Sequence, residues 1–192
     1  MKKYITVSLI VILIIALVFV LIFFAGKNIL PSIVGNISST NNQVATTTAD
    51  ETLLNQRAPY FDLPDNKGNR IKLNDFVNAP VMIVFWATWN QESADQISII
   101  DNYLLNKTVQ SSLVKVVAIN SLEDTSIVDT FIRRGGYSIP FAFDSTGEVS
   151  NQYNIKSLPT TYFVDRNGMV REIYSGVLSG NMLVDKVENI LK

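Results

Sequence analysis

The sequence predicts an α/β domain with a mixed central sheet, helices on both faces and an N-terminal β-hairpin, preceded by one transmembrane helix. Three observations predict this class. An uncharged apolar run at residues 4–25 opens the chain. Strand-length apolar runs then alternate with helical apolar stripes, which is typical of a sheet with helices packed on it. Two further strand patterns, at residues 160–164 and 169–174, flank a tight turn near the C-terminus.

The run at residues 4–25 contains no charge, no proline and no glycine. Because about 20 apolar residues cross the core of a bilayer as a helix, residues 1–26 are expected to be an uncleaved anchor in the lipid. The alternative is a cleavable signal peptide, but its apolar region is shorter, about 7–15 residues, and ends at a small-x-small site that is not evident here. Lys2 and Lys3 precede the run and only Lys27 follows closely. The positive-inside rule therefore places the N-terminus in the cytoplasm and the rest of the chain outside the cell membrane.

Residues 27–52 are expected to be a flexible linker. From Asn36 to Asp50 the sequence is rich in Ser, Thr and Asn and shows neither helical nor strand periodicity. Such a segment buries too little apolar surface to order itself. The folded domain is therefore expected over residues 53–192, without internal repeats.

The first elements of the domain are predicted to be a hairpin, a buried strand and a helix. Extended segments at residues 59–63 and 71–73 flank the turn-rich segment 65–69. Residues 81–86 (VMIVFW) are continuously apolar, as in a strand that is buried on both faces. Apolar residues then recur three and four positions apart, which predicts a helix whose buried stripe contains Ala94, Ile97, Ile100 and Leu104.

The next elements repeat this alternation. Residues 114–119 predict a second buried strand. Asp124 or Thr125 can cap the helix that follows, and Gly135-Gly136 ends it. The turn at residues 165–168 joins the last two strands as a hairpin. The apolar residues of the final helix are Leu183, Val187, Ile190 and Leu191.

The composition excludes most of the chemistry that an α/β domain could carry. The chain has no cysteine and no histidine. It therefore has no thiolate nucleophile, no disulfide and no redox couple, and it lacks the usual general base and the commonest metal ligand. We expect no cofactor and no metal site. The net charge is -1 and no basic cluster follows Lys2-Lys3, so nucleic acid is not expected as a partner.

Four separated motifs resemble those of one family. They are GNRIKLNDF at 68–76, FWATW at 85–89, VVAINSLED at 116–124 and SLPTTYFVDRNGMV at 157–170. In this order and spacing they resemble the TlpA/ResA-like branch of the thioredoxin superfamily, whose members are also described as redoxin or AhpC/TSA-like proteins. The resemblance covers about residues 59–176 and implies a thioredoxin-like fold. It also implies a membrane-tethered, extracytoplasmic thiol–disulfide oxidoreductase.

The resemblance implies a Cys-x-x-Cys dithiol at the start of the helix after FWATW, where this chain has Asn90 and Ser93. An amide and an unactivated hydroxyl cannot form a disulfide, so the dithiol reaction is lost. Two interpretations of these residues stay open. Asn90 and Glu92 suit the first turn of a helix, as an N-cap and as a charge that complements the helix dipole. Ser93 or Glu92 could instead be a nucleophile, although no histidine is available to activate a serine.

Pro159 matches the cis-proline of the family, so the resemblance implies a cis bond between Leu158 and Pro159. The backbone beside this bond would accept an extended protein or peptide segment by strand addition. The predicted peptide-binding residues are Trp89, Asn90, Leu158, Pro159 and Thr160.

Glu123 matches a glutamate that the resemblance places near the dithiol, where it tunes the titration of the thiols. Because the chain has no thiols, this glutamate has no thiol to tune. The alternative is a solvated or capping carboxylate before the helix at Thr125. Trp86, at the end of a buried strand, is expected in the core, whereas the environment of Trp89 stays open.

We therefore expect a membrane-anchored, extracytoplasmic domain that is not catalytic and that binds a protein or an extended peptide beside Pro159. Two alternatives remain. The chain could act as an oxidoreductase if a partner supplied the cysteines, or it could be a structural subunit of an envelope complex.

Overall fold

The structure is a computed structural model that describes residues 51–106 and 108–192. The anchor expected at residues 1–26, and the linker expected at 27–52 except its last two residues, lie outside the described part. Within the described part, no helix is long and apolar enough to cross a membrane.

Five strands form the central sheet in the order β5-β4-β3-β6-β7. They are β3 (Val81–Trp86), β4 (Lys115–Ser121), β5 (Phe141–Asp144), β6 (Thr160–Val164) and β7 (Val170–Ser175). Strands β3, β4 and β5 are parallel, whereas β6 runs antiparallel to β3 and β7 antiparallel to β6. The sheet is therefore mixed, which confirms the prediction from the sequence.

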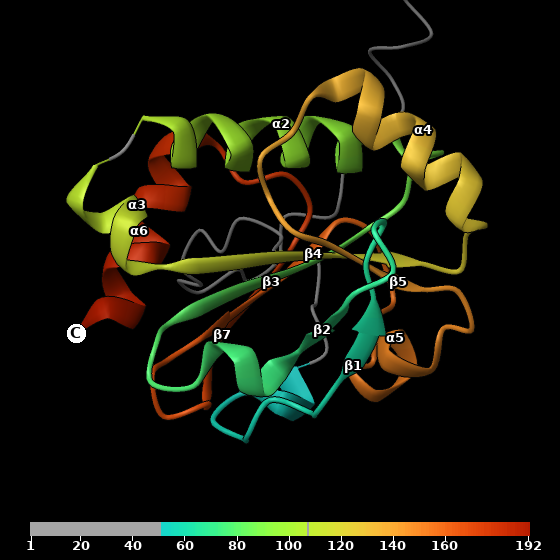
Figure 1. Cartoon of the computed structure of the whole chain (residues 1–192). Coiled ribbons are helices and arrows are strands. Elements are labelled where there is room, and N and C mark those ends of the chain that lie inside the picture. Colours follow the sequence, from blue (N-terminus) through green and yellow to red (C-terminus); the bar gives the residue numbers. More distant parts are fainter. Residues whose placement is uncertain (1–50, 107) are drawn as a thin grey trace, which may run out of the picture. The chain divides into compact units, whose positions relative to one another are not determined.

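Both faces of this sheet are covered (Figure 1). The longer helices α2 (Gln91–Leu105), α4 (Thr125–Gly135) and α6 (Gly180–Leu191) pack on one face. The other face carries α5 (Glu148–Gln152), the short helix η2 (Leu73–Phe76) and the hairpin of β1 (Asp62–Pro64) and β2 (Arg70–Lys72). Every residue of β3 is buried because the strand lies between the two layers.

Besides η2 and the three-residue η1 (Glu51–Leu53), the described part contains three elements that the sequence analysis did not predict: β5, α5 and the short helix α3 (Val109–Leu113). Each has only four or five residues. Such short elements complete at most about one helical turn or two strand repeats, so they give no periodic signal.

The predicted beginning and end of α4 are confirmed. Asp124, not Thr125, is the N-cap of α4, and its carboxylate accepts a hydrogen bond from the Ser126 N–H at 2.8 Å. Gly136 ends α4 in a left-handed conformation with φ 63°, which a residue without a Cβ adopts at little cost.

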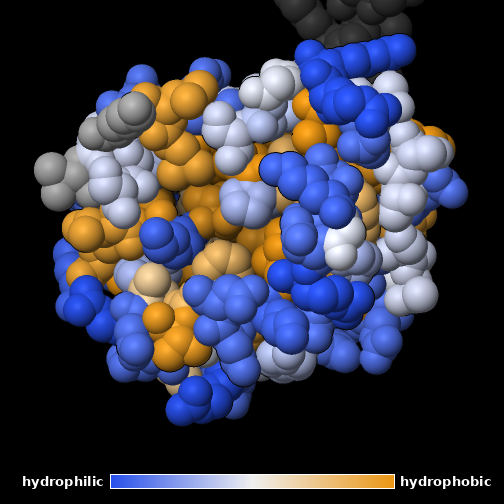
Figure 2. All heavy atoms as spheres, in the orientation of Figure 1, coloured by the Kyte–Doolittle hydropathy of each residue, from blue (hydrophilic) through white to orange (hydrophobic). Residues whose placement is uncertain are grey.

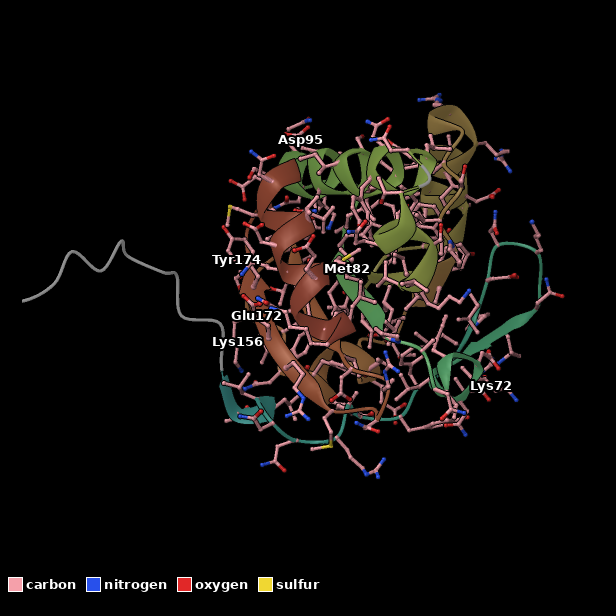
Figure 3. All side chains as sticks on the ribbon, turned by 90° about the vertical axis from the view of Figure 1, so that its left-hand side faces the viewer. Lys72, Met82, Asp95, Lys156, Glu172 and Tyr174 are labelled. Carbon is pink, nitrogen blue, oxygen red and sulfur yellow. The ribbon has the colours of Figure 1, made fainter. Side chains whose placement is uncertain are left out.

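The edge strand β7 is tied to α6 through Lys186. The Lys186 ammonium forms an ion pair with Glu172 and lies 5.0 Å from the centre of the Tyr174 ring. Glu172 and Tyr174 lie along β7 in Figure 3, whereas Met82 of β3 lies in the core and is fully buried. These contacts hold α6 against the edge strand of the sheet.

Candidate functional site

The candidate site lies where β3 ends, α2 begins and β6 begins. Phe85, next to the last residue of β3, pairs with Thr160, the first residue of β6. The loop from Ala87 to Asn90 and the segment before Thr160 therefore meet at the same edge of the sheet. This arrangement brings the predicted site residues together although they are far apart in the sequence.

Asn90 connects these two segments through one side chain. Its Oδ1 accepts a hydrogen bond from the Ser93 N–H at 2.8 Å, which makes Asn90 the N-cap of α2. Its Nδ2 donates a longer hydrogen bond of 3.3 Å to the carbonyl of Leu158. The capping interpretation of Asn90 is confirmed, and the second hydrogen bond adds a contact that the sequence did not predict.

Ser93 is fully buried beneath the first turn of α2. Within the described part of the chain, its hydroxyl has no hydrogen-bond partner. A serine nucleophile needs a hydrogen-bonded base to remove its proton, and none of the described residues bonds the Ser93 hydroxyl. Glu92 is exposed on the solvent side of the same turn. The geometry therefore gives no support to a serine nucleophile at this position.

The Leu158–Pro159 bond is cis, as the resemblance implies. The carbonyl of Leu158 receives the Asn90 amide, and the carbonyl of Pro159 accepts the Gly176 N–H at 2.8 Å. No residue of the described part accepts a hydrogen bond from the Leu158 N–H. The backbone here thus presents one free donor beside an acceptor that is only weakly bonded.

Thr160 is placed differently from the other predicted binding residues. It is buried between β3 and β7, and its hydroxyl donates a hydrogen bond to the carbonyl of Ser157 at 2.8 Å. Its position supports the segment before it, in which Pro159 is buried and Leu158 is half-buried.

The two tryptophans have opposite environments. Trp86 is fully buried, and its ring lies 5.0 Å from that of Phe131, which confirms that it belongs to the core. Trp89 is 71% exposed on the loop before α2. Trp89 directly precedes Asn90, which is bonded to Leu158, so its exposed indole ring is an available contact surface at this loop.

The interpretation of Glu123 as a solvated or capping carboxylate is wrong. The side chain is half-buried, and Asp124 performs the capping. The Glu123 carboxylate accepts hydrogen bonds from the Thr88 N–H at 2.6 Å, from the Thr88 hydroxyl at 2.5 Å and from the Asn120 amide at 2.6 Å. It therefore fixes the loop that carries Trp89.

Sequence reasoning missed an apolar surface beside this loop. Leu122 and Ile127 are 67% and 55% exposed, and a groove of about 690 Å³ extends from Thr88 along α4. The sequence did indicate this surface, because the apolar stripe of α4 is wider than the face that the sheet can cover. Val128 and Ile132 already fill the face of the helix toward the sheet. Ile127 is exposed beside this face, and the half-buried Phe131 lies between the core and the groove.

The chain matches known proteins over most of this domain. A sequence model described as the AhpC/TSA family matches residues 54–173. The thiol-disulfide oxidoreductase ResA of Geobacillus kaustophilus is 31% identical over 133 residues, which cover 69% of this chain and 75% of that protein. ResA of Bacillus subtilis is 30% identical over 135 residues, or 70% of this chain and 74% of that protein.

A solved structure gives the same result for the fold. It belongs to a Chlorobium tepidum protein assigned as the thiol:disulfide interchange protein DsbE and superposes with a TM-score of 0.64 at 26% identity. The match covers 71% of this chain and 96% of that chain, so the fold is thioredoxin-like. The chain therefore belongs to the AhpC/TSA family, as a ResA-like member that has no cysteine and hence no dithiol active site.

Proposed function

We propose that this chain is a membrane-anchored, extracytoplasmic binding module that holds an extended segment of another protein and does not catalyse thiol–disulfide exchange. The observation that supports it best is the free N–H of Leu158, whose carbonyl is bonded to Asn90, the residue after the exposed Trp89. Strand addition takes its affinity from such main-chain donors and acceptors, and an aromatic side chain at the edge adds apolar contact.

The loss of catalysis follows from the composition. Exchange with a disulfide requires a thiolate that attacks sulfur, and the chain contains no cysteine. The contacts that position the site are present: Glu123 is bonded to Thr88, and Asn90 bonds the start of α2 to Leu158. These contacts keep a defined surface in place without a reactive group.

The location is proposed from the sequence. The uncharged run at residues 4–25 is long enough for one membrane crossing, and Lys2 and Lys3 favour a cytoplasmic N-terminus. A domain outside the membrane meets protein segments that are not yet folded, which are the natural ligands of a strand-addition edge.

The test uses a defined unfolded probe, reduced and S-carboxymethylated α-lactalbumin, with the full-length chain in detergent micelles. Binding is followed through the fluorescence anisotropy of fluorescein attached to amino groups of the probe, so that the readout does not depend on the exposed Trp89. The probe should bind, and Trp89→Ala should weaken binding by about tenfold or more, as truncation of an aromatic anchor does.

Val77→Ala is the matched control, because Val77 is similarly exposed, at 64%, but lies in the loop before β3 at the other end of that strand. It should leave binding unchanged. Absence of binding by the unfolded probe, or equal losses in the two variants, would refute the proposed function.

A further inference from the structure

The groove beside the candidate site has an aromatic floor. The rings of Phe131 and Tyr137 are stacked at 5.4 Å with an angle of 21° between their planes. Phe131 also packs against the buried ring of Trp86. Gly135 makes room for Tyr137, because a Cβ at this position would lie 2.0 Å from the Tyr137 ring. The floor is therefore fixed by core contacts, and it is suited to an apolar side chain.

The hydroxyl groups along the groove offer no free hydrogen to a ligand. Their hydrogens are already donated: Thr88 Oγ1 to Glu123, Ser126 Oγ to Asp124, Thr130 Oγ1 to the Ser126 carbonyl, and Tyr137 OH to Ser98 Oγ. Tyr137 must be the donor in the last pair, because Ser98 donates its own hydrogen to the Ala94 carbonyl. The groove thus provides apolar contact and hydroxyl acceptors along most of its length.

Arg134 is the exception. It is the only charged side chain among the described residues that line the groove, and no ion pair within the described part involves it. Its neighbour Arg133 is paired with Asp129 one helical turn away and does not line the groove. The C-terminal end of α4 is strongly hydrophilic in Figure 2. The groove therefore ends at a guanidinium group that forms no ion pair with the described residues and has up to five N–H donors.

The two ends of α4, along which the groove runs, differ in charge. Asp124 caps the N-terminal end of α4, where hydrogen bonds from the Ser126 side chain and backbone lower the pKa of its carboxyl group. A second carboxylate is disfavoured there and favoured near Arg134. This polarity gives a ligand one preferred orientation along α4.

We propose that the groove takes a protein segment that carries an apolar anchor and, about three residues away, an Asp or Glu that pairs with Arg134. The inference rests on the proposed function and names the class of segment that the module prefers. The apolar anchor occupies the floor beside Ile127 and Phe131. The carboxylate meets the guanidinium at the far end, where paired N–H···O bonds add direction to the contact.

The spacing follows from the geometry of the helix. Ile127 and Arg134 are seven positions apart in α4, and a rise of about 1.5 Å per residue separates them by about 10 Å along the helix axis. An extended segment advances about 3.3 Å per residue, so about three residues span this distance.

The experiment measures the affinity of fluorescein-labelled peptides for the full-length chain in detergent micelles. The probe is Thr-Thr-Leu-Thr-Thr-Glu-Thr-amide with fluorescein on its N-terminal amine, and its partner has Gln in place of Glu. The Glu peptide should bind about three- to tenfold more tightly than the Gln peptide, which is the size of effect expected for a partly exposed charge-assisted pair. The ratio should fall as salt is added.

Arg134→Gln should reduce this ratio to about one, and Arg133→Gln should preserve it, because Arg133 is paired with Asp129 outside the groove. Equal affinities of the two peptides for the unmodified chain, or equal effects of the two variants, would overturn the inference and leave the proposed function standing. If neither peptide bound, the inference would be overturned, whereas the α-lactalbumin probe tests the proposed function separately. Decanoate that binds in an Arg134-dependent manner without any peptide binding would assign the groove to a free amphiphile instead.

Discussion

The carboxylate of Glu123 accepts a hydrogen bond from the backbone N–H of Thr88 at 2.6 Å, across a separation of 35 residues in the sequence. This contact joins the loop after β4 to the loop between β3 and α2. The Thr88 hydroxyl and the Asn120 amide donate to the same carboxylate. Partial burial of a carboxylate is unfavourable unless hydrogen-bond donors replace the lost water. Glu123 therefore holds the loop that carries Trp89 against the end of β4.

Replacement of Glu123 by Gln should destabilise the domain. The amide keeps the shape of the side chain but replaces one acceptor oxygen by a donor, which leaves a donor of Thr88 or Asn120 without an acceptor. We expect a loss of about 1–3 kcal/mol in the free energy of unfolding, measured by urea denaturation. Glu92→Gln is the control, since Glu92 is exposed in the first turn of α2, and its loss should stay below about 1 kcal/mol. Equal losses in the two variants would show that the three hydrogen bonds of Glu123 contribute little.

Ser93→Ala should leave the domain as stable as before or make it more stable, by up to about 1 kcal/mol. The Ser93 hydroxyl is buried without a partner in the described part, and alanine has the higher helix propensity. The control is Ser98→Ala in the same helix, because the Ser98 hydroxyl bonds the Ala94 carbonyl and contacts Tyr137. Thermal unfolding of both variants checks the difference. A marked loss of stability in Ser93→Ala would mean that its hydroxyl has a partner in solution.

The double variant Asn90→Cys with Ser93→Cys should form an intramolecular disulfide and gain measurable dithiol exchange. Both residues lie at the start of α2, where Asn90 already bonds the Ser93 N–H. Cβ atoms need to approach only to about 4 Å for a disulfide, and a thiolate at a helix N-terminus has a depressed pKa. The lost cap should cost about 1 kcal/mol. Thiol counting under oxidising and reducing conditions measures the outcome.

Gln91→Cys with Ser93→Cys is the matched control for this variant. Residues two apart on a helix do not face each other, and here Gln91 is exposed while Ser93 is buried. The control should keep two free thiols. If the Asn90→Cys, Ser93→Cys chain also kept two independent thiols, these positions would not correspond to the dithiol of the family.

Membrane topology gives a further prediction. Protease added to intact spheroplasts should remove the domain at residues 53–192, because the run at 4–25 is expected to anchor it outside the cytoplasmic membrane. Immunoblotting of the spheroplast pellet measures the loss. A cytoplasmic protein of the same cells serves as the control and should stay intact. Full protection of the domain, or its release as a shortened soluble product, would contradict the anchor.

The sequence by itself determined the class of the fold and the absence of redox chemistry. Buried strands and amphipathic helices repeat over short distances, so the patterns around β3, α2, β4 and α4 can be found locally. The lack of cysteine is a property of composition and needs no coordinates. The capping role of Asn90 also followed from the sequence, because its partner Ser93 is three residues away.

Only the tertiary structure decided how the site is held. The contact of Asn90 with Leu158 spans 68 residues, and that of Glu123 with Thr88 spans 35. A local pattern states that a side chain is polar, but it does not state which distant donor the folded sheet brings within about 3 Å. For the same reason the sequence left the exposure of Trp89 open and missed the groove at Arg134. Both depend on which faces of the loop and of α4 the remainder of the domain leaves uncovered.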